Sequence, residues 1–176
     1  MRRVVTLTEL PVLRRLNHFF PGQLLTAEDL HVEQRYQRER SRLHNQLLHG
    51  SGVVAGLEVR SRKGRIIVSP GVALDRVGNE VILGAETEVA TISATGKPGA
   101  KYVVIRHVET LADPTPVAGD DPELVAVHYR HVIEGAECSV QDAEPSRTRS
   151  DVVLARILWR TSQWRVDPRY RRPKVR

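Results

Sequence analysis

The chain has 176 residues, 40% of them hydrophobic, and a formal net charge of +6. This length suits one domain, or one domain with an extended arm. The single cysteine, Cys138, excludes an internal disulfide framework and a thiolate-based zinc site, which fits a reducing compartment. No stretch reaches the roughly 20 apolar residues of a membrane-spanning helix, and we expect no signal peptide. A cytoplasmic location is therefore predicted.

Residues 1–25 are predicted to form an extended N-terminal arm, because Pro11 and the Pro21-Gly22 pair interrupt regular structure. Phe19 and Phe20 stand beside this turn and are the only phenylalanines in the chain. Adjacent phenylalanines next to a turn usually plug a local core. We therefore expect them to anchor the arm.

Residues 26–50 are predicted to form one long helix. Thr26 can cap the free N–H groups of the first turn, and Glu28 and Asp29 complement the helix dipole there. Neither proline nor glycine interrupts the run before Gly50, which supplies a C-terminal stop. The expected length is roughly 22 residues, or about 33 Å.

The apolar residues of this helix form only a thin seam in a strongly charged surface. Such a seam is narrower than the apolar stripe of a helix buried in a globular core. The helix is therefore predicted to dock onto partner subunits or to pair with copies of itself, giving a homo-oligomer, with a trimer as one candidate. The predicted docking residues of the seam and arm are Phe19, Phe20, Leu30, Val32, Tyr36, Leu43 and Leu47.

Residues 51–168 are predicted to form a β domain, because the hydrophobic period changes to two and β-branched residues become frequent. The fold class is α+β, mainly β, with the arm and long helix followed by a small antiparallel β-sandwich or barrel. Polar loops are expected at 110–123 and at 134–150, which contains Cys138. Strands are expected at 53–59, 65–68, 72–74, 80–83, 86–93, 101–109, 124–133, 151–159 and 163–166.

Residues 169–176 are predicted to form a basic tail. Together with the end of the β domain, the tail offers six cationic side chains for an anionic partner: Arg165, Arg169, Arg171, Arg172, Lys174 and Arg176. Such a cluster can bind nucleic acid, an anionic surface or an acidic protein. Trp159, Trp164 and Tyr170 could add a stacking platform for single strands, although aromatic residues on a terminal strand more often close a sandwich. A nucleic-acid-binding module is thus the alternative function.

The histidines do not predict a metal site. His44 and His49 are five residues apart, which places them off a common face of an α-helix. His128 and His131 are three apart on an expected strand, and odd offsets point to opposite faces. We therefore predict no metal ligands and no cofactor.

No constellation of catalytic residues is predicted either. Asp75 and Glu80 flank a glycine turn and could serve acid–base chemistry, but Asp75 is better explained as bonding its own loop backbone while Glu80 opens the return strand. Ser51 lacks the pattern of a nucleophile elbow. Cys138 follows Glu137, which opposes thiolate formation. Phosphate-binding glycine motifs are missing, so the chain is predicted not to be an enzyme.

Four stretches together resemble a known family: 17–30 (NHFFPGQLLTAEDL), 44–50 (HNQLLHG), 52–59 (GVVAGLEV) and 68–75 (VSPGVALD). They are similar to small proteins found beside phage-tail-like contractile injection systems, and to base domains that attach phage tail fibres to baseplates. The resemblance covers roughly residues 17–83. It implies a structural role as a baseplate or fibre-attachment adaptor, incorporated in a particle, with other particle subunits as partners and no catalytic residues.

Overall fold

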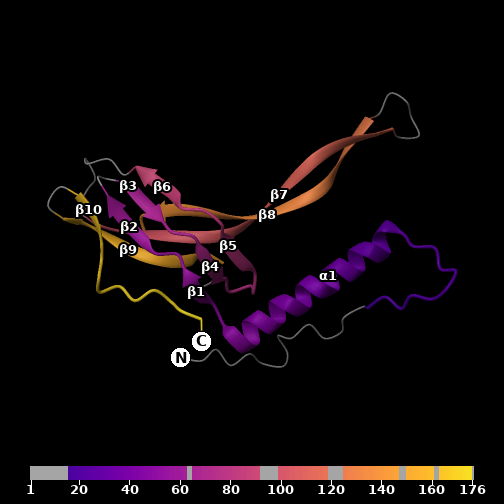
Figure 1. The fold of residues 1–176 in the computed structure, drawn as a ribbon, viewed down its shortest axis with the longest axis horizontal. Helices are drawn as coiled ribbons and strands as arrows, with labels where there is room; N and C mark the ends of the chain where they lie inside the picture. Colours follow the sequence, from indigo (N-terminus) through magenta and orange to yellow (C-terminus); the bar gives the residue numbers. More distant parts are fainter. Residues whose placement is uncertain are drawn as a thin grey trace.

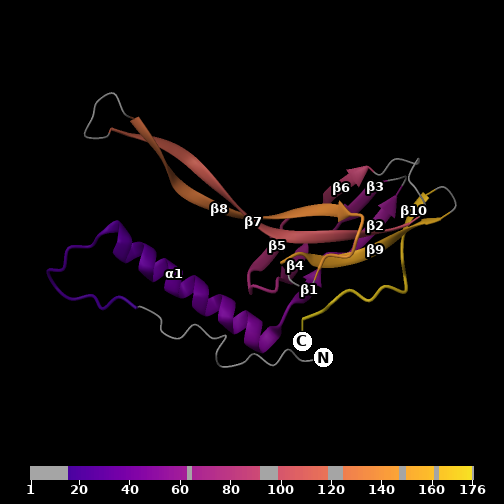
Figure 2. The same ribbon diagram turned by 180° about the vertical axis from the view of Figure 1, so that it is seen from behind.

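The computed structural model describes residues 16–62, 65–91, 99–118, 125–146, 150–160 and 163–175. Helix α1 (Ala27–His44) and a long hairpin of β7 (Ala100–Ala118) and β8 (Val125–Gln141) extend from a β body in the same general direction (Figure 1), as the view from behind also shows (Figure 2). The predicted α+β, mainly β class is confirmed. In the part of the chain that the structure describes, no helix is long and apolar enough to cross a bilayer.

Helix α1 begins where the sequence predicts. The Thr26 hydroxyl accepts a 3.3 Å hydrogen bond from the Asp29 backbone N–H, and the Asp29 carboxylate accepts one of 3.0 Å from the Thr26 backbone N–H. These two bonds make a capping box. After His44 the chain continues as a single π-helical turn, η2 (Asn45–His49), and Gly50 ends it with φ 74°. The predicted end at Gly50 is therefore confirmed, but the widened last turn was not expected.

Ten strands in the described ranges form three open antiparallel sheets. The strand orders are β1-β4-β5, β2-β3-β6 and β10-β9-β7-β8. No sheet closes into a barrel, so the barrel alternative is wrong. The bounds not yet given are β1 (Gly52–Gly56), β2 (Val59–Arg62), β3 (Arg65–Val68), β4 (Gly71–Leu74), β5 (Glu80–Leu83), β6 (Thr87–Thr91), β9 (Val152–Arg160) and β10 (Gln163–Val166).

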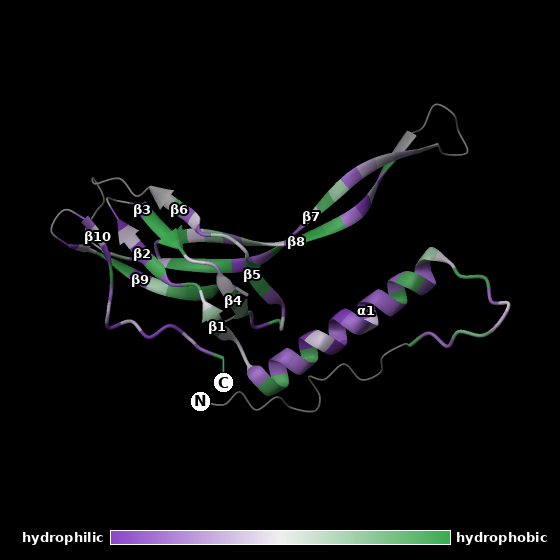
Figure 3. Ribbon diagram, viewed as in Figure 1, coloured by the Kyte–Doolittle hydropathy of each residue, from purple (hydrophilic) through white to green (hydrophobic). Residues whose placement is uncertain are grey.

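The three sheets share one hydrophobic core. The two three-stranded sheets pack against the four-stranded sheet, with contacts from β5 and β6 to β8, from β1 to β9 and from β2 to β10. Ile66, Val81, Val103 and Ile157 are fully buried there, and the Trp164 side chain is 2% exposed. Figure 3 shows hydrophobic residues concentrated in these facing strands and a mainly hydrophilic α1. Trp164 therefore closes the core of the β body, as expected for an aromatic residue on a terminal strand.

Two strand predictions need correction. The expected strand 53–59 is divided between β1 and β2, which belong to different sheets. Leu57 lies at the break with a positive φ of 54° and a fully buried side chain. Burying this leucine at a bend lets the chain leave one sheet and enter the next, which an uninterrupted apolar pattern does not reveal.

The expected loops at 110–123 and 134–150 are the second correction. Residues 110–118 continue β7 and residues 134–141 continue β8, in one constant register from Tyr102↔Gln141 to Ala118↔Val125. Pro114 and Pro116 favour a loop in the sequence, yet both lie within β7. Beyond Ile105, β7 pairs with β8 alone, and prolines are tolerated on such edge strands.

The C-terminal residues lie along β1 instead of projecting freely. The Val53 N–H donates to the Pro173 carbonyl at 2.9 Å, and the Val175 N–H donates to the Val53 carbonyl at 3.2 Å. A Cβ on Gly52 would lie 2.8 Å from the backbone of Pro173 and Lys174. Glycine at position 52 thus makes room for this segment.

Candidate docking surface

The loop between β4 and β5 is organised by Asp75, whose side chain is almost completely buried. One carboxylate oxygen accepts hydrogen bonds of 2.8 Å from the backbone N–H groups of Val77 and Asn79, and the other accepts 2.8 Å from the Asn79 side-chain amide. Glu80 opens strand β5. The loop-stabilising interpretation of Asp75 is confirmed, and its carboxylate is fully engaged within the loop.

This loop holds the C-terminal end of α1 and the η2 turn. Gly78 has φ 88°, and a Cβ there would lie 2.2 Å from the Arg42 carbonyl oxygen, so only glycine allows the two backbones to approach so closely. The buried Asn45 amide donates to the Gly78 carbonyl at 2.9 Å, and the Arg42 Nε donates to Asn79 Oδ1 at 2.6 Å. Gln46 also donates to the Val77 carbonyl. The helix therefore leaves the β body in a direction set by this junction.

Ion pairs connect α1 to the base of the β7–β8 hairpin. Glu109 and Glu134 are directly opposite each other in the hairpin register. Arg38 contacts both carboxylates, Glu134 at 3.7 Å, and Arg42 approaches Glu109 at 3.8 Å. Two acids facing each other across a strand pair repel, and the helix arginines offset that repulsion. All four side chains are at least a third exposed, so each pair contributes at most about 1 kcal/mol.

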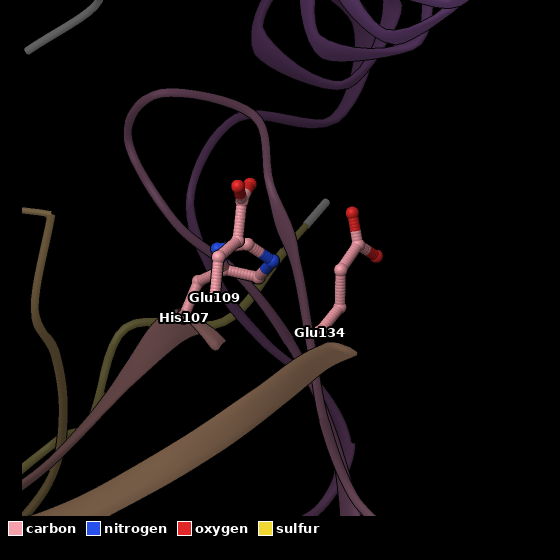
Figure 4. Close-up of side chains that lie close together, drawn as sticks. All are labelled: His107, Glu109 and Glu134. Atoms are coloured by element: carbon pink, nitrogen blue, oxygen red, sulfur yellow. The ribbon is translucent and has the colours of Figure 1, made fainter. Parts of the chain in front are cut away.

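His107 joins the two glutamates in a group whose possible ligand atoms all lie within 4.8 Å of one another. Figure 4 shows the three side chains projecting from one side of the hairpin. The sequence gives no signal for this group, because hairpin pairing places Glu134 beside His107 and Glu109, which are more than 20 positions away. The contacts with Arg38 and Arg42 already supply positive charge to both carboxylates. We therefore interpret the group as part of an ion-pair network.

The residues predicted to dock onto partners fall into two sets. Phe19, Phe20, Leu30 and Leu47 have exposed fractions of 48%, 59%, 52% and 46%, so the expectation that the phenylalanines plug a local core is wrong. Helix α1 contains no buried residue, and its remaining seam positions are partly covered: Val32, Tyr36 and Leu43. The part of the N-terminal arm that is described begins at Leu16, and Asn17 binds the Asp29 carbonyl near the start of α1.

A second apolar surface lies on the β7–β8 hairpin and was missed in the sequence. Val127, Tyr129 and Ile133 are each at least half exposed. They alternate along β8, and Pro116 and Pro114 face Val127 and Tyr129 in the register, so these residues share one face of the hairpin. The alternation was visible in the predicted strand 124–133, but nothing in the sequence showed that the strand projects away from the core.

Among the predicted anionic-partner residues, the Arg172 side chain and the Lys174 backbone are attached to the body. Arg172 donates to the Leu57 carbonyl at 2.6 Å and also contacts the Glu58 carboxylate. Lys174 forms a parallel bridge with Val53. Exposed side chains remain at Arg165, Arg169, Arg171 and Lys174, whereas Arg176 lies outside the described residues.

The histidine pairs differ from the prediction in one case. The Nε2 atoms of His44 and His49 are 3.3 Å apart, so the expectation that they lie off a common face is wrong. The reason is η2, because a π-helical turn brings residues i and i+5 together. In the other pair, His131 contacts the Asp113 carboxylate at 2.6 Å, whereas His128 is paired with Thr115 in the hairpin register.

Comparison with solved structures identifies the fold. The chain matches a chain of the type VI secretion system TssK-TssF-TssG baseplate subcomplex with a TM-score of 0.54 and 14% identity, covering 93% of this chain and 62% of that one. It matches the crystal structure of TssK with a TM-score of 0.53 and 13% identity, covering 88% and 41%. A third match is a chain of the type VI baseplate complex, with a TM-score of 0.51, 13% identity and coverage of 93% and 60%.

These matches extend over nearly the whole of this chain but over less than two thirds of each structural neighbour. No family model and no curated protein sequence matches the chain. At this level of identity the likeness concerns the arrangement of the elements. The structural neighbours nevertheless come from the baseplate of a contractile injection system, the class of particle that the sequence resemblance indicates.

Proposed function

We propose that this chain is a structural component of the baseplate of a phage-tail-like contractile injection particle. Its partners are other particle subunits, and it works by protein–protein docking as an adaptor or fibre-attachment element. The observation that carries the proposal is the shared fold with type VI baseplate proteins. The sequence stretches between residues 17 and 83 support it independently.

The arrangement of the molecule favours docking through its two projecting elements. A compact β body holds α1 at the junction around Gly78, and the β7–β8 hairpin extends in the same general direction (Figure 1). Both carry large apolar side chains that remain exposed, as Leu30 on α1 and Tyr129 on β8 illustrate. Apolar surface of this kind gains stability when a partner covers it.

Isolation of the assembled particles tests the proposal. Particles sedimented from cells that produce this chain should contain it, as detected by mass spectrometry. The double variant Phe19→Glu/Phe20→Glu and the variant Tyr129→Glu should reduce its incorporation. Ile82→Glu is the matched control, because Ile82 is equally exposed but lies on the β body. A chain that stays out of the particles would refute the proposal.

Self-association through the α1 seam is a separate proposal. Val32, Tyr36 and Leu43 give the helix a narrow apolar seam, which pairing with a second copy would cover. Light scattering of the purified protein should show an oligomer that Tyr36→Glu and Leu43→Glu dissociate. A wild-type monomer would rule out this mode of assembly.

We further propose that the role is non-enzymatic. The buried Asp75 carboxylate serves its own loop, and burial together with Glu137 raises the pKa of the Cys138 thiol to about 11, which disfavours a nucleophilic thiolate. The fold gives no support to the nucleic-acid alternative, and Arg172, one of the cations it relies on, is engaged by the body. At physiological salt, about 0.15 M, purified protein should accordingly show no retention on single-stranded DNA, because a purely electrostatic attraction is weakened by salt.

A further inference from the structure

The π-helical turn η2 places two imidazole rings in a converging arrangement at the end of the helical segment. The Nε2 atoms of His44 and His49 are 3.3 Å apart, whereas the ring centroids are 5.1 Å apart. The two rings therefore turn their Nε2 edges toward a common point. Neither ring has another partner among the hydrogen bonds and ion pairs of the described residues.

This separation suits a tetrahedral metal ion. Zinc binds histidine nitrogen at about 2.0–2.1 Å and prefers tetrahedral geometry. Two nitrogen ligands at that distance and at the tetrahedral angle lie about 3.3–3.4 Å apart. The observed 3.3 Å meets this requirement without movement of the backbone.

We propose that His44 and His49 bind one zinc ion through their Nε2 atoms, with water completing the coordination. His44 is exposed and His49 is partly exposed, so the ion can enter from solvent. Without metal, one Nε2 atom donates its proton in a hydrogen bond to the other. For both Nε2 atoms to bind zinc, the donor ring releases that proton to solvent and takes one at Nδ1, so that both rings bind the metal as neutral imidazoles. Imidazole suits zinc better than calcium or magnesium, which prefer oxygen ligands.

The other group of possible ligands is a poorer zinc site. Arg38 contacts Glu109 and Glu134 and supplies a positive charge beside them, so a cation there would have to displace the arginine. The nearest cation to the histidine pair along the chain, Arg42, is directed to Asn79. The two candidate sites lie on different elements and can be tested separately.

Titration of zinc chloride into the untagged, metal-free chain tests the proposal by calorimetry. One equivalent should bind, and His44→Gln and His49→Gln should each abolish binding, because one imidazole cannot chelate. His128→Gln is the matched control on an exposed histidine of β8, and it should bind zinc as the wild type does. Cobalt(II) added to the wild type should give the intense visible absorption of a four-coordinate site.

Three results would overturn the proposal: no binding by the wild type, binding that survives both single variants, or binding that is lost in His107→Gln instead. Circular dichroism distinguishes loss of the ligand from loss of the fold. Both histidines lie outside the hydrophobic core, so the variants should retain the wild-type spectrum.

Discussion

Three hydrogen bonds converge on the carboxylate of Asp75, and all three come from its own loop. Replacing a buried acceptor leaves donors without partners, at a cost of about 1–3 kcal/mol. We predict that Asp75→Ala lowers the free energy of unfolding by about 2–3 kcal/mol, measured by urea denaturation. Glu80→Ala is the control and should change it by less than about 0.5 kcal/mol, because Glu80 is exposed. Equal effects of the two variants would contradict this account of the loop.

Cys138 should react slowly with thiol reagents in the folded protein. Burial, and to a lesser extent Glu137, raises its pKa from 9.0 to about 11. The thiolate is the reactive form. At pH 8, raising the pKa of the thiol by about two lowers the thiolate fraction about 100-fold. The rate of modification by a disulfide reagent should fall by about this factor relative to the urea-unfolded chain. Equal rates in the two states would contradict the prediction.

Single residues with local partners were predictable from the sequence. Asp75 and Thr26 bond to groups within four positions, so their roles follow from turn and capping preferences. The closeness of His44 and His49 was not predictable, because it depends on a π turn that the helical pattern does not distinguish from an α turn. The exposure of Phe19 and Phe20 also could not be predicted, since it depends on which surfaces the rest of the chain leaves uncovered.

At the level of elements, the orientation of α1 depends on Gly78. Alanine there would require an unfavourable positive φ and would place its Cβ 2.2 Å from the Arg42 carbonyl oxygen. We predict that Gly78→Ala separates the end of the helix from the β4–β5 loop and speeds amide hydrogen exchange in residues 42–49. Gly84→Ala is the matched control, because a Cβ at Gly84 meets nothing within 4 Å. Unchanged exchange in Gly78→Ala would show that the junction does not fix the helix.

The ion pairs between α1 and the hairpin should contribute much less to this orientation. Arg38 and Glu109 are 44% and 36% exposed, so solvent screens their attraction. A double-mutant cycle with Arg38→Ala and Glu109→Ala should give a coupling of at most about 1 kcal/mol that decreases in high salt. A larger, salt-independent coupling would indicate that the ion pairs, and not the junction, hold the helix.

For the whole molecule, the Asp167 carboxyl makes the folding stability depend on pH. The Arg169 backbone N–H at 3.0 Å, and then the Arg156 guanidinium, lower the pKa of the Asp167 carboxyl below 3.8. A carboxyl with a lower pKa in the folded state contributes stability above its unfolded pKa and loses it as the pH falls through the folded value. The melting temperature should therefore decrease below about pH 4.

Asp167→Asn checks this linkage. The variant should be less stable at neutral pH, and its melting temperature should decrease less steeply in acid than that of the wild type. Asp142→Asn provides the control, because the Asp142 side chain is 86% exposed. Parallel acid curves for the wild type and Asp167→Asn would exclude Asp167 as the source of the pH dependence.

The overall class of the fold was predictable, but the assembly of its sheets was not. Period-two patterns located most strands, and β10 has the predicted bounds. Which strands pair depends on contacts between distant parts of the chain, such as Arg172 with Leu57 and Val53 with Lys174. These contacts have no local signal, so the sequence could not show that the basic tail lies along β1.

The constant register of β7 and β8 makes the hairpin adjustable in length. Two residues added to each strand beyond Ile105 would lengthen it by about 7 Å and keep every side chain on its present face. One residue added to each strand would exchange the two faces distal to the insertion. Since the core residues of β7 end at Ile105, the reach of this chain toward a partner can change while the β body stays the same.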